Sequence, residues 1–283
     1  MKKILVGLDL TKMDETLISY AHFLQQQWKL EKVHFVHNIK RYEMDEVLED
    51  LVGEKDIKAL IEKNLLSKIT KVIPVSSSFT LDIKEHDSTE FSLKNLANER
   101  SIDTIILGFK QEDYGTAAMS QKLIRMFKGD VILVPQAASM QWDRILVPSD
   151  LSGPFQVVLQ KLKHFKDLVP QPEIKILKSY GIPSTFFPYI DDKRAIEKTH
   201  KHIEKQYQEV QRKLNVPGNF DFVARYQEDE SVVDVIEREC KKTKADLIVM
   251  AAKGASKIPA VFIGSTINEL LNTKPFQAVY ILQ

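Results

Sequence analysis

The stretch that decides the fold is Lys3-Ile-Leu-Val-Gly-Leu-Asp9-Leu-Thr11, because it returns later in the chain as Arg144-Ile-Leu-Val-Pro-Ser-Asp150-Leu-Ser152. Each copy has a basic residue, three apolar residues, two spacers and an aspartate, followed by leucine and a hydroxyl residue. A short apolar run that ends in polar residues is typical of a buried strand. The repetition itself indicates two copies of one fold.

Further matches occur in the same order along the chain. They pair 102–108 with 245–251 and 131–134 with 279–282, at offsets of 143 and 148 after the first offset of 141. We therefore expect two domains, residues 1–138 and 142–283. The joint between them, residues 136–140, lacks the composition of a flexible linker, which favours packed halves.

Within each copy, short apolar runs alternate with longer amphipathic stretches. The predicted strands are 3–8, 32–38, 77–84, 103–108 and 130–134, then 144–148, 173–178, 219–226, 246–251 and 277–282. The predicted helices are 13–28, 43–70, 89–99 and 116–127, then 154–166, 191–213, 231–242 and 265–272. Near-continuously apolar strands separated by helices predict an α/β protein with two tandem, doubly wound, five-stranded parallel-sheet domains. Ligands of such sheets bind beyond the carboxyl ends of the strands, where the strand order reverses.

Composition excludes some partners. The 283 residues are 43% hydrophobic with a formal net charge of +1, which indicates soluble domains with no global attraction to nucleic acid or an anionic membrane. No apolar stretch approaches the roughly 18 residues that span a bilayer, and no signal-peptide core is evident. The single cysteine, Cys240, excludes an intrachain disulfide and fits a reducing cytoplasm.

The loop after the strand 246–251 carries the best candidate for a ligand site. Gly254 and Gly264 let the backbone approach a phosphate, and Ser265 and Thr266 open a helix whose free N–H groups and hydroxyls can bind it. Alternatively, Ser265 or Thr266 only caps the helix and Gly264 only turns the chain.

Lysines flank the first glycine of this loop. Lys253 and Lys257 either meet a phosphate as point charges or are ordinary solvated loop lysines. The loop lacks the Gly-Lys-Ser/Thr ending of a Walker motif, so a standard P-loop nucleoside triphosphatase is disfavoured.

These residues resemble a known family: both copies are similar to universal stress protein domains, and the whole chain resembles a tandem universal stress protein. The resemblance rests on the aspartates that end the first strand (Asp9, Asp150) and open the fourth (Asp103, Asp246), and on the closing fifth strand. Nucleotide-binding members of the family carry Gly-x2-Gly-x9-Gly-Ser/Thr after the fourth strand. In the second copy Gly254-x9-Gly264-Ser265 fits this pattern, but Ala251 replaces the first glycine.

The resemblance implies an adenine nucleotide alpha-hydrolase-like fold whose halves are related by a pseudo-two-fold, with Val131–Pro135 paired to Ala278–Leu282. It places Asp150 against the adenosine, although capping of the next helix is an alternative role that can coexist. The nucleotide-binding residues that it implies are Pro148, Ser149, Asp150, Met250, Ala251, Lys253, Gly254, Gly264, Ser265 and Thr266.

The first copy departs further from the family pattern. After Gly108 the loop reaches Gly115-Thr116 early, lacks the middle glycine, and places Glu112 and Asp113 where they would repel a polyphosphate. We interpret this first site as degenerate, and capping is the role expected of Asp9.

The remaining polar motifs predict structure more than chemistry. His34 and His37, and likewise His200 and His202, lack metal-site spacing, and Cys240 is predicted to be a packing residue. Residues 191–214 carry apolar residues on one helix face and predict a surface helix. The aromatic loop 183–190 either packs on its own domain, covers the crevice or contacts a partner.

The leading hypothesis is a cytoplasmic regulatory protein of the stress response that binds ATP, AMP or another adenine nucleotide, with or without Mg²⁺, in its second domain. Its partners would be an unidentified protein, its own other domain as an internal pseudo-dimer, and a second chain in a homodimer. We expect no catalytic residue, although slow incidental ATP hydrolysis is compatible with this hypothesis. The alternatives are a nucleotide-free interaction scaffold with no tightly bound cofactor, and a true nucleotidyltransferase or hydrolase.

Overall fold

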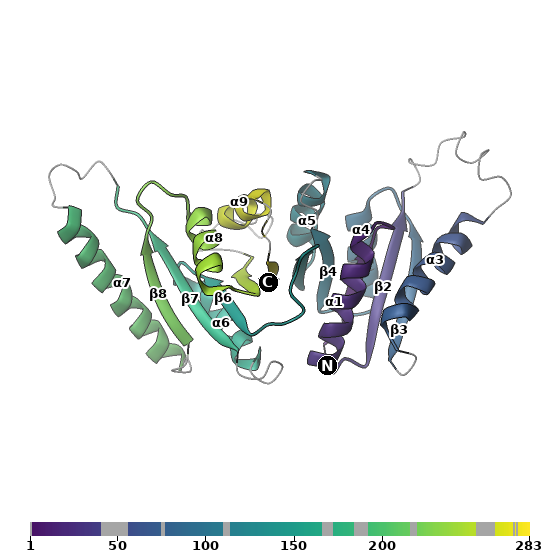
Figure 1. Ribbon diagram of the computed structural model, residues 1–283, viewed down its shortest axis with the longest axis horizontal. Coiled ribbons are helices and arrows are strands. Elements are labelled where there is room, and N and C mark those ends of the chain that lie inside the picture. The colour runs from purple at the N-terminus through teal and green to yellow at the C-terminus, as the bar shows by residue number, and fades with distance from the viewer. Residues whose placement is uncertain are drawn as a thin grey trace. The chain divides into compact units, whose positions relative to one another are not determined.

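The chain divides into two compact units, residues 1–140 and 141–283. The computed structural model in Figure 1 describes residues 2–40, 56–74, 77–109, 114–165, 172–183, 192–215, 220–252, 264–273, 275 and 277–283. Element labels are those of that figure, and each unit is described by itself.

The first unit is a five-stranded parallel sheet with the order β3-β2-β1-β4-β5. Its strands are β1 (Ile4–Leu8), β2 (Lys32–Ile39), β3 (Ser78–Glu85), β4 (Thr104–Phe109) and β5 (Asp130–Pro135). Its described helices are α1 (Met13–Gln27), α3 (Ile57–Val72), α4 (Thr89–Glu99) and α5 (Tyr114–Met126). Contacts pair α1 with α3 and α4 with α5, as expected when helices cover both faces of a sheet.

The second unit repeats this topology with the order β8-β7-β6-β9-β10, again entirely parallel. Its strands are β6 (Arg144–Pro148), β7 (Glu173–Tyr180), β8 (Phe220–Tyr226), β9 (Leu247–Ala251) and β10 (Ala278–Leu282). Its described helices are α6 (Gly153–Phe165), α7 (Asp192–Leu214), α8 (Val232–Thr243) and α9 (Ser265–Thr273). The predicted doubly wound fold is confirmed, and the strand order reverses between β1 and β4 and between β6 and β9.

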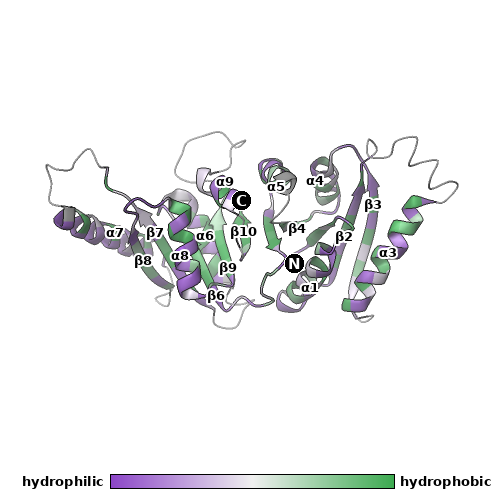
Figure 2. Cartoon of the chain, turned by 45° about the horizontal axis from the view of Figure 1, so that its top comes forward, coloured by the Kyte–Doolittle hydropathy of each residue, from purple (hydrophilic) through white to green (hydrophobic). Residues whose placement is uncertain are grey.

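Burial explains why the apolar runs become central strands. Every residue of β5 and β10 is buried, and so are the first four residues of β9. A strand covered by helices on both faces needs apolar side chains in both directions, which the hydropathy colours show for the central strands (Figure 2).

The aspartate that opens the fourth strand of each copy binds the backbone at the start of the first strand. Asp103 accepts a hydrogen bond from the Lys3 N–H at 2.8 Å, and Asp246 accepts one from the Arg144 N–H at 3.0 Å. Asp246 is also buried and pairs with the Arg144 guanidinium at 3.2 Å. This repeated residue is therefore a structural link between two neighbouring strands.

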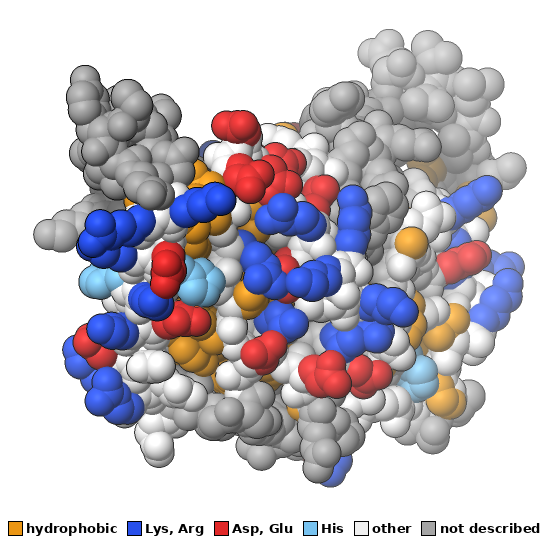
Figure 3. All heavy atoms as spheres, turned by 60° about the vertical axis from the view of Figure 1, so that its left-hand side comes forward, with side chains coloured by type: hydrophobic (Ala, Val, Ile, Leu, Met, Phe, Trp, Pro, Cys, Tyr) orange, Lys and Arg blue, Asp and Glu red, His pale blue; other side chains and the backbone are white. Residues whose placement is uncertain are grey.

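The helix α7 confirms the predicted amphipathic surface helix. Ile203 and Tyr207, both on the predicted apolar face, are buried, and Tyr207 stacks on Phe222 of β8 with ring centroids 4.1 Å apart. The face of the molecule that carries α7 shows Lys and Arg side chains interspersed with Asp and Glu (Figure 3). Such a mixed surface agrees with a helix whose polar face is solvated.

The single helix predicted over residues 43–70 is wrong at its centre. Asp56 has extended backbone, and its carboxylate accepts a hydrogen bond from the Ala59 N–H at 3.1 Å, so α3 begins at Ile57. An aspartate N-cap begins a helix because it satisfies donors that have no partner within the helix. Residues 41–55 lie outside the described part of the chain, and the pairing of Val131–Pro135 with Ala278–Leu282 stays a prediction.

Candidate functional site

The carboxyl end of β6 forms a tight turn before α6. Ser149 Oγ accepts a hydrogen bond from the Leu151 N–H, and Asp150 Oδ1 accepts one from the Ser152 N–H, both at 2.9 Å. Leu151 has a φ of 62°, in the left-handed region that a branched side chain rarely occupies. The Asp150 carboxylate thus stabilises the turn that precedes α6, its predicted capping of that helix stays a prediction, and its exposed side chain borders a pocket.

The first unit forms the same turn at the equivalent position of the sequence. Asp9 Oδ1 accepts from the Thr11 N–H at 3.1 Å, and Leu10 has a φ of 66°. The two copies therefore share an unusual backbone, and their differences lie in the side chains around it.

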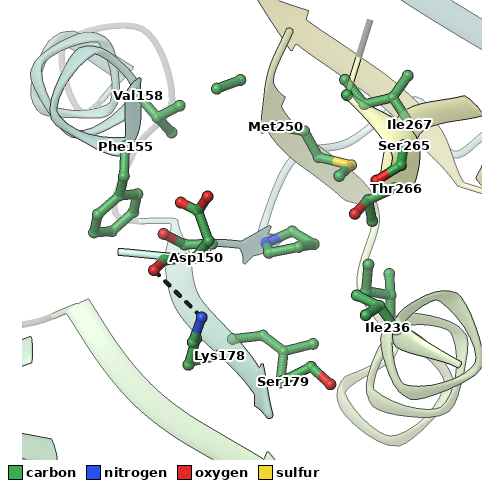
Figure 4. Close-up of a pocket in the computed structure, with 16 residues that line it drawn as sticks. Asp150, Phe155, Val158, Lys178, Ser179, Ile236, Met250, Ser265, Thr266 and Ile267 are labelled. Carbon is green, nitrogen blue, oxygen red and sulfur yellow. Dashed lines mark hydrogen bonds between the residues drawn. The ribbon is translucent and has the colours of Figure 1, made fainter. Parts of the chain in front are cut away.

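The strand β7 supplies the next wall of the pocket. Its Leu177 carbonyl accepts a hydrogen bond from the Ser149 N–H at 2.9 Å, which holds the ends of β6 and β7 together. The Lys178 ammonium donates to the Asp150 carbonyl oxygen at 3.3 Å, and this contact is drawn in Figure 4. Burial lowers the pKa of Lys178, and the attraction of Asp150 only partly opposes that effect.

The helix α9 supplies the opposite wall. The Gly264 N–H donates to the Ala252 carbonyl at 3.1 Å, which attaches the start of α9 to the chain just after β9. The first N–H groups of a helix have no acceptor within it, so the amides of Ser265 and Thr266 are available to an anion. Their hydroxyls add two possible donors at the same place.

Apolar side chains complete the pocket, which has a volume of about 330 Å³. They come from α6, α8 and α9, and they are Phe155, Val158, Val232, Ile236 and Ile267. In Figure 4 Phe155 and Val158 lie on one side of the pocket and Ile236 on another, with Asp150 and Lys178 between them. An apolar cavity that ends at a helix N-terminus suits a ligand with a flat apolar ring and an anionic group.

Most of the predicted site residues meet in this pocket. Those that line it are Pro148, Ser149, Asp150, Met250, Ala251, Gly264, Ser265 and Thr266. The two others, Lys253 and Gly254, lie outside the described residues, as do Lys257 and the rest of residues 253–263. The pocket lies at the carboxyl ends of the strands where their order reverses, as doubly wound sheets predict.

Sequence reasoning missed the contributions of α6, α8 and β7. Lys178 and Ser179 end a strand and carry no motif, and Ser179 Oγ is buried with no partner among the described residues. The available signal was positional: β7 neighbours β6, so polar residues at its carboxyl end border the same crevice.

In the first unit, different side chains lie at the equivalent strand ends. A β-carbon at Gly108 would lie only 2.5 Å from Cγ of Met13, so Met13 packs directly on the backbone at the end of β4. The fully buried Asp14 accepts from the Asp9 N–H at 2.9 Å and pairs with Lys68 at 2.8 Å. Residues 110–113, which include Glu112 and Asp113, lie outside the described part, and so does the side chain of Thr116.

The histidines and the cysteine have local partners. His37 Nδ1 lies 2.9 Å from the Leu8 carbonyl, and His34 Nδ1 lies 2.8 Å from Thr80 Oγ1. Burial raises the pKa of Cys240 to about 12, which makes it an inert packing residue. No group of three potential metal ligands occurs among the described residues.

The helices in the described part include none long and apolar enough to cross a membrane.

His200 and His202 lie on α7 and contact Tyr180 and Gln206, respectively. The aromatic loop is outside the described residues from 184 to 190. The three alternatives for this loop, packing on its own domain, covering the crevice and contacting a partner, therefore stay predictions.

Comparison with protein families relates the second unit to a known group. The model of the Universal stress protein family matches residues 141–277, almost the whole second unit. The match does not include the first unit. Among curated proteins, none matches the sequence.

Solved structures share the fold of the entire chain. A functionally unknown protein from Pseudomonas aeruginosa PAO1 has a TM-score of 0.69 and 14% identity, covering 100% of this chain and 92% of its own. A universal stress protein from Archaeoglobus fulgidus DSM 4304 has a TM-score of 0.64 and 15% identity, covering 99% of this chain and 96% of its own. The likeness extends over both units and concerns the fold.

Proposed function

We propose that this chain is a universal stress protein-like regulatory protein that binds ATP or another adenine nucleotide in its second unit. The family match over residues 141–277 supports a stress-protein function. The observation that carries nucleotide binding is the pocket, because residues from β6, β9 and the start of α9, far apart in sequence, line one cavity.

The chemistry of the pocket fits the parts of a nucleotide. A phosphate at the start of α9 would accept from the amides and hydroxyls of Ser265 and Thr266, and the helix dipole would favour its charge. The apolar side chains of α6 and α8 would contact the base. Asp150 would accept from the ribose hydroxyls through its exposed carboxylate, which borders the cavity.

Ala251 replaces the first glycine of the family pattern at the end of β9. Its methyl group is the smallest side chain that the site could carry, so we propose that it weakens the approach of a phosphate without closing the pocket. Mg²⁺ would arrive with the nucleotide, because among the described lining residues Asp150 is the sole carboxylate.

The function of binding would be regulatory. A nucleotide that bridges β6 and α9 favours the conformation in which both walls are in place, and a partner that binds this conformation responds to nucleotide level. We propose no catalytic residue, a cytoplasmic location, and association of the two units as an internal pseudo-dimer with further pairing of whole chains.

A nucleotide-free scaffold is the second candidate, and the first unit favours it. There Met13 packs on the end of β4, and the Asp14 carboxylate is already paired with the Asp9 N–H and Lys68. Ala251 in the second unit would then mark a site that is losing its ligand in the same way.

Isothermal titration calorimetry with ATP and Mg²⁺ tests the proposal. We expect about one site per chain, abolished by Gly264→Asp, because a carboxylate beside the start of α9 repels phosphate. Asp150→Ala should weaken binding, whereas Asp9→Ala should not, although both changes remove the same turn. No binding at millimolar ATP would reject the proposal in favour of the scaffold, and multiple-turnover hydrolysis at ordinary enzyme rates would indicate an enzyme.

A further inference from the structure

Lys178 is a cation that the proposed adenine nucleotide leaves unused. Among the described residues that line the pocket, Lys178 and Asp150 are the two charged side chains. The ammonium of Lys178 contacts a neutral acceptor, the Asp150 carbonyl oxygen, at 3.3 Å. No carboxylate of the described residues lies within ion-pair distance of it.

A partly buried ammonium without an ion pair is poised to bind an anion. Burial lowers the pKa of Lys178 more than the charge of Asp150 raises it. The negative charge around the ammonium therefore does not fully compensate for its loss of water. A ligand anion would restore the favourable interaction that the ammonium lost on leaving water.

The position of Lys178 separates this anion from the one at α9. The strand order β9-β6-β7 puts one strand between β9, which leads to α9, and β7, which carries Lys178. Two strand spacings amount to about 10 Å. In Figure 4 Lys178 lies beside Asp150, whereas Ser265 and Thr266 lie beside Met250 across the pocket.

We propose that Lys178 binds a second anionic group, and that the pocket takes a nucleotide with a phosphate on its ribose as well as on its 5′ carbon. This inference rests on the proposed function. With the 5′-phosphate at α9, the ribose lies near the end of β6, and its 2′ or 3′ substituent faces β7. The Asp150 carboxylate would repel such a phosphate, but its Oδ1 already accepts a hydrogen bond within its own turn. The Lys178 ammonium has two further N–H donors besides the one that it gives to the Asp150 carbonyl.

A pair of isomers tests this placement of charge. ADP and adenosine 3′,5′-bisphosphate have the same atoms and two phosphates each, but only the second carries a phosphate on each side of the ribose. We expect calorimetry to show that the wild-type chain prefers adenosine 3′,5′-bisphosphate by about tenfold or more, as a charge-assisted contact provides. Adenosine 2′,5′-bisphosphate, titrated in parallel, identifies which ribose position faces Lys178.

Variants assign the preference to Lys178. Lys178→Met keeps the aliphatic stem and should bring the ratio of the two affinities close to one, because it removes the contact with the phosphate on the ribose. Lys178→Arg should retain the preference. Lys201→Met is the matched control, because it removes the same charge from an exposed ion pair with Glu197 on α7 and should leave the ratio unchanged.

The outcomes separate this inference from the proposed function. If the wild-type chain binds ADP but neither bisphosphate more tightly, the inference is wrong and the nucleotide site stands. If the preference survives Lys178→Met in a variant that still binds ADP, another residue makes the contact and the inference is again wrong. If no nucleotide binds at all, the proposed function fails and this inference fails with it.

Discussion

Replacing Asp246 with alanine tests whether the aspartate repeated at the fourth strand is a structural link. Asp246 is 6% exposed and accepts hydrogen bonds from the Arg144 N–H at 3.0 Å, the Arg144 guanidinium at 3.2 Å and the Gln141 amide at 3.4 Å. Asp103 in the first unit accepts from the Lys3 N–H at 2.8 Å but is exposed. The two positions therefore share a bond and differ in burial.

The expected losses of stability reflect that difference. A hydrogen bond to a buried charged group contributes about 1.5–3 kcal/mol, and water replaces an exposed one at lower cost. We expect Asp246→Ala to lower the unfolding free energy of the second unit by about 3 kcal/mol, and Asp103→Ala to lower that of the first unit by about 1 kcal/mol. For units of this size these losses correspond to about 10 °C and about 3 °C in melting temperature.

Hydrogen exchange followed by mass spectrometry measures the two units separately, because peptides from β1 and β6 differ in sequence. Calorimetric melting of the same variants gives the temperature shifts. Asp246→Asn keeps an acceptor for the backbone N–H and should fall between wild type and Asp246→Ala. Equal losses at the two positions, or a loss below about 1 kcal/mol for Asp246→Ala, would refute the assignment of a buried structural link.

Three further outcomes depend on single residues. Burial and the charge of Arg100 lower the pKa of His34 below its ordinary 6.5. Near this pH the unfolded chain therefore binds more protons than the folded chain, so the unfolding free energy should fall as the pH drops below about 6.5. Denaturant melts of His34→Gln should show a smaller fall. Cys240, with a pKa raised to about 12, should react with a thiol reagent only in denaturant, and native labelling would contradict its burial. Gly108→Ala, whose new β-carbon would meet Met13 Cγ at 2.5 Å, should cost about 1–2 kcal/mol in denaturant melts; an unchanged midpoint would show that Met13 moves freely.

The strands were predictable because each is a short apolar run with polar ends. The repeat of Lys3–Thr11 in Arg144–Ser152 also predicted equivalent turns, and the structure gives both copies the same aspartate hydrogen bond and the same left-handed leucine. Local sequence decides these features, since they depend on residues close together in the chain. The eight described residues predicted for the site end strands or begin helices, and the doubly wound fold brings those positions together at one pocket.

The errors and omissions came from features that a local pattern does not encode. Residues 43–70 have the pattern of one amphipathic helix, but the side chain of Asp56 caps a helix that starts at Ile57. An aspartate in a charged stretch has the same appearance whether it caps a helix or faces solvent. Lys178 was missed because its importance depends on β7 lying next to β6, a neighbour relation set by topology.

The two copies differ in the residues that they place at equivalent strand ends. The backbone turn after the first strand is the same, so the difference lies in the first turn of the next helix, which has Asp14 in the first copy and Phe155 at the equivalent place in the second. Asp14 is buried against the Asp9 N–H and Lys68, which attaches the crevice to α3 and gives it a carboxylate. Phe155 has no polar group to satisfy and lines the cavity instead. If the second unit binds a nucleotide as proposed, we therefore expect binding to depend on the side chain that the helix after β6 brings to the strand ends as well as on the glycine pattern.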